Sequence, residues 1–164
     1  MHNLFTYLNT SFFKHSMFWI IVFLYFVLSV NNHSMFASYR HLLESYGIIV
    51  IAQIITAYTC IYILIPKFLN NKKIGLFILW MLILLVSVHA VYQAVRMYYF
   101  DVVYFDSYDA VQRSYAVDSY WKRLSSYSLF ISKCVLYLTP TALLLMARFY
   151  KNQQKFLKLN EQKK

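Results

Sequence analysis

Long apolar runs separated by short polar segments constrain this chain more than any other feature of its sequence. A helix needs roughly 20 residues to cross the hydrocarbon core of a bilayer. A chain of 164 residues therefore has room for several such helices and for little else. Because 60% of the residues are hydrophobic and the mean hydropathy is +0.48, water would not keep the chain folded as a monomer. The sequence predicts an all-α integral membrane bundle.

Four transmembrane helices are expected, at about 16–36, 46–65, 74–97 and 126–147. The apolar centre of the first, 17–30, is short and must borrow residues from one of its flanks to cross the bilayer. The second is expected to stop at Pro66, which lacks the N–H that a helix interior needs. Segment 101–123 is expected to form an outer loop, and 148–164 a cytoplasmic helical linker.

The distribution of Lys and Arg predicts the orientation, because these residues are retained on the cytoplasmic side. The connection between the second and third spans and the tail are rich in basic residues, whereas the first connection offers only Arg40. An even number of spans then places both termini in the cytoplasm of an inner (plasma) membrane protein. Three basic residues in the outer loop weaken this bias: Arg113, Lys122 and Arg123. The loop also carries every aspartate of the chain: Asp101, Asp106, Asp109 and Asp118.

Three polar residues fall within the predicted spans, namely Gln53, His89 and Lys133. Each lies roughly seven to ten residues from the outer end of its helix, so at about 1.5 Å per residue they share one depth. We expect either a sensing layer in which Lys133 pairs with His89 or Gln53, or separate roles. In the second case Lys133 extends alone to the interface and the other two bond between helices.

The outer loop interleaves aromatic residues with its charges. Tyr and Trp rings favour the headgroup region, which accounts for the aromatic residues nearest the spans. Those farther into the loop favour a short amphipathic cap on the membrane, and the alternative is a ligand pocket.

The fourth span and the tail contain a potential signalling path. Pro140 removes the helical hydrogen bond to the carbonyl of Leu136 and is a candidate hinge. Phe149 and Phe156 are seven residues apart, with Leu159 at the complementary position, which predicts a short coiled-coil seam. A basic tail on the membrane surface is the alternative.

The motifs of common enzymes and metal sites are absent from the sequence. With Gly47 and Gly75 as its only glycines, the chain has no phosphate-binding loop and no dinucleotide fingerprint. Cys60 and Cys134 lie on different predicted spans, and the histidines show no metal-site spacing. We therefore expect no catalytic residue, no cofactor and no metal in this chain.

Segment 58–69 resembles the exit of the second span in LytS/YehU-like sensor histidine kinases of the Bacteroidetes type; its sequence is YTCIYILIPKFL. The usual pattern there is Tyr-x-Asn-x-Tyr-x-Leu-x-Pro-x-Phe-Leu, and Cys60 stands where the family has Asn. The residues that match are Tyr58, Tyr62, Leu64, Pro66, Phe68 and Leu69. The resemblance implies a sensor that dimerises and signals through a kinase core to a LytTR-type response regulator. No histidine follows His89, so the phosphoacceptor and the ATP-binding domain would lie outside this chain.

The expected function is therefore that of a membrane input module, the sensor portion of a longer kinase. A small transporter or channel, or a membrane accessory or assembly protein, is the alternative. The bilayer and a second copy of the chain are the expected partners. The net charge of +10 does not predict nucleic-acid binding, because the basic residues lie beside apolar runs, where topology and anionic lipid explain them.

Overall fold

The computed structural model describes residues 11–29, 36 and 38–161, and this part of the chain contains helices and no strand. The long helices are α2 (Ser11–Leu28), α3 (Tyr39–Thr59), α4 (Ile74–Val95) and α8 (Tyr127–Glu161). π-Helical segments extend two of them, Cys60–Leu69 after α3 and Arg96–Phe100 after α4. The loop between α4 and α8 holds α5 (Asp101–Val103), a 3-10 turn at Phe105–Ser107, α6 (Ala110–Ala116) and α7 (Tyr120–Leu124).

Three of these helices are long and apolar enough to cross a membrane: Tyr39–Leu69, Ile74–Val103 and Tyr127–Gln154. The chain is therefore helical with three candidate spans. The first of the four expected spans, 16–36, corresponds to the shorter apolar helix Phe13–Leu28. With 18 residues, α2 is about 27 Å long, slightly less than the roughly 30 Å of a hydrocarbon core.

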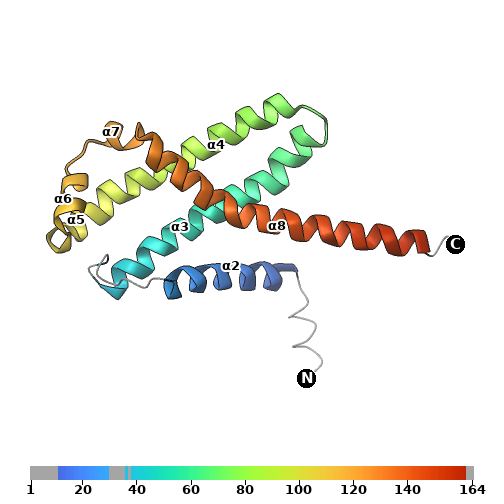
Figure 1. Ribbon diagram of the computed structural model, residues 1–164, viewed down its shortest axis with the longest axis horizontal. Coiled ribbons are helices and arrows are strands. Elements are labelled where there is room, and N and C mark those ends of the chain that lie inside the picture. The colour runs from blue at the N-terminus through green and yellow to red at the C-terminus, as the bar shows by residue number, and fades with distance from the viewer. Residues whose placement is uncertain (1–10, 30–35, 37, 162–164) are drawn as a thin grey trace, which may run out of the picture.

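Helix α3 is the centre of the bundle. It packs against α2 on one side and against α4 and α8 on the other, and α8 crosses both α3 and α4 (Figure 1). One core cluster joins Ala52 of α3, Val88 of α4 and Tyr137 of α8, and a second joins Trp19 of α2 to α3. In the apolar window of the α3 segment 50% of the residues are buried, against 11% for the α4 segment and 17% for the α8 segment. The exposed apolar sides of α4 and α8 are suited to contact lipid.

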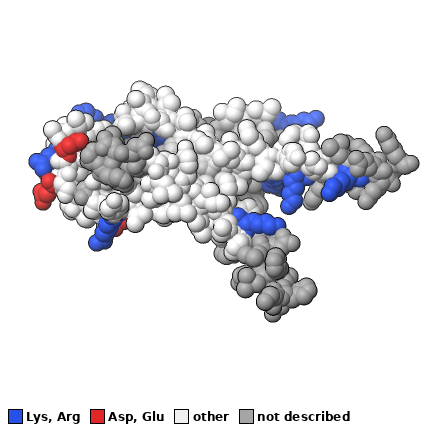
Figure 2. Space-filling view, turned by 60° about the horizontal axis from the view of Figure 1, so that its bottom comes forward, with Lys and Arg blue, Asp and Glu red and all other residues white. Residues whose placement is uncertain are grey.

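The bundle has two different ends. The loop end carries α5, α6 and α7, and the tail end carries the start of α2, the turn between α3 and α4, and the free part of α8 (Figure 1). Figure 2 shows acidic and basic side chains together at the loop end and a broad uncharged band; towards the tail end the charged side chains that are not grey are basic. This arrangement agrees with helices that alternate in direction across a bilayer.

Pro66 does not end the second long helix, and that expectation was wrong. The helix begins at Tyr39, where the Ser38 side chain accepts the His41 N–H at 3.2 Å, and it continues through Pro66 to Leu69. A proline ring clashes with the carbonyl four residues before it in an α-helix. The wider π-helical turn allows bonds to the carbonyl five residues back, such as the 3.0 Å bond from the Asn70 N–H to the Ile65 carbonyl. The third and fourth predicted spans also extend, to Val103 and into the tail, and 148–161 continues α8 without a break. The first predicted span, 16–36, is shifted instead: α2 begins at Ser11 and ends at Leu28.

The turn between α3 and α4 is closed by a Schellman-type cap. The Lys73 N–H donates to the Phe68 carbonyl at 2.9 Å, and the Lys72 N–H donates to the Leu69 carbonyl at 3.0 Å. Lys72 has φ of 59°, a left-handed conformation that costs a residue with a Cβ roughly 1–2 kcal/mol.

We expect Lys72→Gly to raise the free energy of unfolding in detergent by about 1 kcal/mol, because glycine adopts this conformation without the Cβ penalty. Lys73→Gly is the matched control: it removes the same charge from a residue with φ of −90° and should give no gain. Equal effects of both substitutions would show that charge rather than backbone strain decides the result.

Candidate functional site

A buried ion pair organises the loop end. Arg123 of α7 is 1% exposed and pairs with the carboxylate of Asp101, which begins α5. Its guanidinium also donates to two backbone carbonyls, from Nε to Asp118 at 3.0 Å and from Nη2 to Ala116 at 2.6 Å. One side chain therefore joins three segments of the loop, so the loop is held as a cap across the end of the bundle.

Tyr108 adds a second contact to the same carboxylate. Its hydroxyl donates to Asp101 Oδ1 at 3.2 Å, and its ring packs with Phe100 and Tyr104 in an aromatic cluster. Burial, together with the negative charge of Asp101, raises the pKa of Tyr108 to about 12, because the phenolate would be poorly solvated beside a carboxylate.

This shift predicts alkaline instability of the cap. Between pH 10, the ordinary pKa of tyrosine, and about 12 the unfolded chain ionises at this position and the folded chain does not. The stabilisation is complete below pH 10 and decreases as the pH rises towards 12. We expect the phenolate absorbance of the wild type to contain a component rising near pH 12 that Tyr108→Phe lacks. If the component that Tyr108→Phe lacks instead rises near pH 10, the ordinary pKa of tyrosine, the raised pKa of Tyr108 is contradicted.

Glu44 connects α3 to this cap. Its carboxylate pairs with Arg40 at 2.6 Å and accepts hydrogen bonds from the hydroxyls of Tyr99 at 3.1 Å and Tyr104 at 3.0 Å. His41, one turn earlier, stacks on the Tyr104 ring with centroids 4.2 Å apart. Glu44 is the only acidic residue in the first half of the sequence, and no role was predicted for it.

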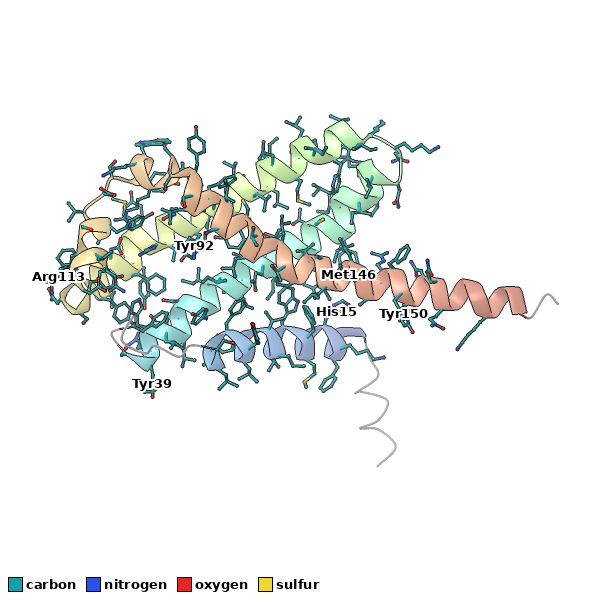
Figure 3. All side chains as sticks on the ribbon, viewed as in Figure 1. His15, Tyr39, Tyr92, Arg113, Met146 and Tyr150 are labelled. Carbon is teal, nitrogen blue, oxygen red and sulfur yellow. The ribbon has the colours of Figure 1, made fainter. Side chains whose placement is uncertain are left out.

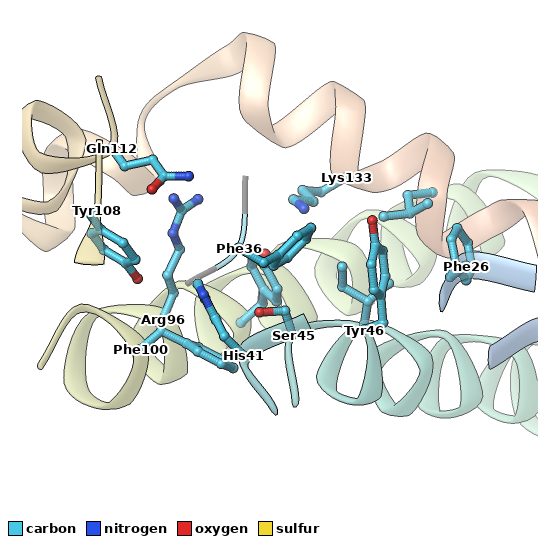
Figure 4. Close-up of a pocket in the computed structure, with 13 residues that line it drawn as sticks. Phe26, Phe36, His41, Ser45, Tyr46, Arg96, Phe100, Tyr108, Gln112 and Lys133 are labelled. Atoms are coloured by element: carbon cyan, nitrogen blue, oxygen red, sulfur yellow. The ribbon is translucent and has the colours of Figure 1, made fainter. Parts of the chain in front are cut away.

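A cavity of about 430 Å³ lies at this end, between α3, the end of α4, α8 and the cap (Figure 4). We call it the loop-end cavity. Aromatic, basic and neutral polar side chains line it, and none of the lining residues is acidic. The full lining consists of Phe26, Phe36, His41, Ser45, Tyr46, Ile49, Tyr92, Arg96, Phe100, Tyr108, Gln112, Lys133 and Leu136.

Two basic side chains from different helices point into this space. Arg96 comes from the π-helical segment after α4, and Lys133 comes from α8 (Figure 4). The Arg96 guanidinium lies 4.9 Å from the centroid of the Tyr115 ring, and the Lys133 ammonium lies 4.6 Å from that of Tyr92. No role at a site was predicted for Arg96 from the sequence. π-Helical turns are frequent at functional sites, but this one has no distinctive sequence signal.

The three residues of the predicted polar layer, Gln53, His89 and Lys133, are not joined by hydrogen bonds among the described residues. Gln53 and His89 are both 0% exposed, but neither has Lys133 as a hydrogen-bond partner among the described residues. The Gln53 amide donates to the Leu136 carbonyl at 2.9 Å, and His89 Nε2 lies 3.4 Å from Gln93 Nε2. Lys133 instead faces the loop-end cavity.

The bond from Gln53 explains how Pro140 is accommodated. Pro140 lies inside α8 and cannot donate to the Leu136 carbonyl, so this carbonyl would be unpaired in an apolar interior. Gln53 reaches across from α3 and supplies the missing donor. Neighbouring helices commonly satisfy backbone groups freed by proline in this way. Whether Pro140 acts as a hinge stays a prediction.

Residues of the family-like motif serve in helix packing. Tyr58 accepts a 3.2 Å bond from Trp19 Nε1 and stacks on Tyr62, and Leu64 is buried. Phe68 stacks on Trp80 of α4, whereas Leu69 is exposed. The structure thus gives these positions a packing explanation that requires no shared function.

The predicted seam begins on the exposed part of α8. Phe149 is 66% exposed, and Met146 and Tyr150 beside it are also exposed (Figure 3). Phe156 and Leu159 lie on the same helix, but their side chains are outside the described set, so the seam stays a prediction.

Within the described residues, no group of three or more His, Cys, Asp or Glu side chains could hold a metal ion. Cys60 and Cys134 are free thiols. Comparison with known proteins gives no family: no family model, no curated protein and no solved structure matches the chain.

Proposed function

We propose that this chain is a membrane-embedded input module, which passes a change at the loop-end cavity along α8 to a partner domain in the cytoplasm. One observation carries the proposal: α8 is a single helix of 35 residues that bears Lys133 at the cavity and extends beyond the rest of the bundle (Figure 1). At 1.5 Å per residue it is about 52 Å long, enough to cross a bilayer and project from it.

Helix α8 is continuous from Lys133 to the tail, so a contact made at Lys133 would move the tail, either as one rigid unit or by a change of bend at Pro140. Helix α8 crosses both α3 and α4, and the interhelical bond from Gln53 to the Leu136 carbonyl lies one turn from Lys133. Two arrangements of this crossing, biased by what occupies the cavity, would form the switch.

The specific form of the proposal is the sensor region of a two-component histidine kinase in the inner membrane. Four spans, cytoplasmic termini and a homodimer joined along Phe149, Phe156 and Leu159 belong to this form. Support comes from the resemblance at 58–69, the basic tail end and the continuous α8. A kinase core would supply the phosphoacceptor histidine and ATP site, and a LytTR-type response regulator would receive the phosphoryl group.

Cysteine crosslinking in membranes tests this function. In a background of Cys60→Ala and Cys134→Ala, we expect disulfide-linked dimers to recur every three to four residues along 146–160. Lys133→Gln should shift the positions of highest yield. A single cysteine at Ile78, on the exposed side of α4, is the control and should give the same crosslinking yield with and without Lys133→Gln. Uniform yields along the tail, or a pattern that Lys133→Gln leaves unaltered, would refute transmission through α8.

The topology has a separate test. An impermeant amine reagent added outside the cell should label Lys122, which is exposed at the loop end, and spare Lys151 and Lys158 on the tail. The reverse pattern would overturn the orientation on which the signalling proposal depends.

A further inference from the structure

Among the described residues, no acidic side chain lines the loop-end cavity or forms an ion pair with Arg96 or Lys133. The chain contains six acidic residues. Three of them pair with other cations: Glu44 with Arg40, Asp101 with Arg123, and Asp118 with Lys122. Asp106 and Asp109 are on the cap and do not line the cavity, and Glu161 lies at the opposite end of α8.

Arg96 and Lys133 therefore place two positive charges around one space without an ion-pair partner among the described residues. Both side chains are partly buried, and a cation removed from water costs free energy unless it gains compensating contacts. The contacts with the Tyr115 and Tyr92 rings offset part of this cost. An anion between the two groups would offset more, because hydrogen bonds between charged partners are the strong ones.

The rest of the cavity indicates the shape of the anion. About 430 Å³ falls within the range of roughly 300–1,000 Å³ that is typical of small-molecule sites, and it is much larger than an inorganic anion needs. One wall of the cavity is apolar and consists of Phe26, Phe36, Ile49, Phe100 and Leu136. A ligand that matches this lining has one acidic group and an apolar body.

We infer that the loop-end cavity binds the acidic headgroup, phosphate or carboxylate, of an amphiphilic anion between Arg96 and Lys133, with its apolar part against the phenylalanine wall (Figure 4). The ligand is a phospholipid of the surrounding leaflet or a free fatty-acid-like molecule, since both present the same chemistry. The binding site stands without the proposed function; only the identification of this anion as the stimulus rests on it.

Native mass spectrometry of the full chain in one nonionic detergent tests the site. The probes are decanoate with decanol as its neutral match, and phosphatidylglycerol with phosphatidylcholine as its zwitterionic match. We expect the anionic member of at least one pair to bind at least about ten-fold more tightly than its match. Stronger binding of phosphatidylglycerol assigns the ligand to the leaflet, and stronger binding of decanoate assigns it to free amphiphiles.

Variants locate the binding. Arg96→Gln and Lys133→Gln should each weaken binding of the preferred anion about ten-fold or more, and Lys133→Arg, which keeps the charge, should retain it. The matched controls Arg113→Gln and Lys122→Gln remove loop-end cations that do not line the cavity and should bind like the wild type. Equal binding by Lys133→Gln and Lys122→Gln, or no preference for the anionic probes, would overturn the site. If Arg96→Gln fails to fold, the comparison of Lys133→Gln with Lys133→Arg decides whether the anion binds at this cavity.

The tail crosslinks distinguish the two proposals. If an anion binds and the crosslink pattern of 146–160 is unchanged, the binding site is supported and signalling by this ligand is refuted. If the crosslink pattern responds to Lys133→Gln but no anion binding can be measured, transmission through α8 is supported and the binding site is refuted.

Discussion

Arg123→Met is expected to lower the free energy of unfolding by about 3–5 kcal/mol. The substitution leaves the Asp101 carboxylate buried without its cation, because the side chain of Asp101 is 7% exposed and that of Arg123 is 0% exposed. It also removes the donors to the carbonyls of Asp118 and Ala116. Thermal unfolding in detergent measures the loss, and tryptic cleavage after Arg113 reports the opening of the cap.

The control is the neighbouring residue. Lys122 also pairs with an aspartate, Asp118, but its side chain is 71% exposed, so water already screens the pair. Lys122→Met should cost about 1 kcal/mol or less. The double variant Asp101→Leu with Arg123→Met should recover part of the stability, since it leaves no unpaired buried charge. If Arg123→Met and Lys122→Met cost the same, the ion pair does not hold the cap.

Gln53→Leu is expected to cost about 1–3 kcal/mol, and Pro140→Ala should remove most of this cost. In the wild type, the Leu136 carbonyl depends on the Gln53 amide because Pro140 has no N–H to donate. An alanine at 140 supplies an intrahelical donor to the same carbonyl, so the loss of Gln53 then leaves no backbone group unpaired. Unfolding measurements on the two single variants and the double variant give the coupling energy.

Gln93 provides the matched control for this cycle. It is a glutamine of equal burial, 1% exposed on α4, and it bonds to His89 rather than to α8. The cost of Gln93→Leu should be the same with proline or alanine at 140. A Gln53→Leu cost that is also independent of residue 140 would refute the proposed compensation.

Several features of this protein were predictable from local chemistry. Apolar runs of bilayer length give long helices regardless of their neighbours, since a backbone in lipid must satisfy its hydrogen bonds within its own segment. The sequence therefore predicted the all-helical fold and, among four expected spans, the three candidate spans that the structure contains. It also predicted the carbonyl that Pro140 leaves without a donor.

Other features depend on a local backbone conformation that has no sequence signal, or on contacts between segments that are distant in the chain. Pro66 was expected to end its helix, but a π-helical turn accommodates it. Gln53 and Leu136 are 83 residues apart, and Arg123 and Asp101 are 22 apart, so no local pattern indicates either pairing.

The sequence by itself determined that this chain forms apolar helices with an excess of basic residues in the tail and in the turn between the second and third spans, because those properties depend only on the composition and order of each segment. Only the tertiary structure decided that Arg96 and Lys133 meet across one cavity while the nearby acids are paired elsewhere. The physical reason is that a charge acts through its distance from other charges and from water, and those distances arise only when the helices pack.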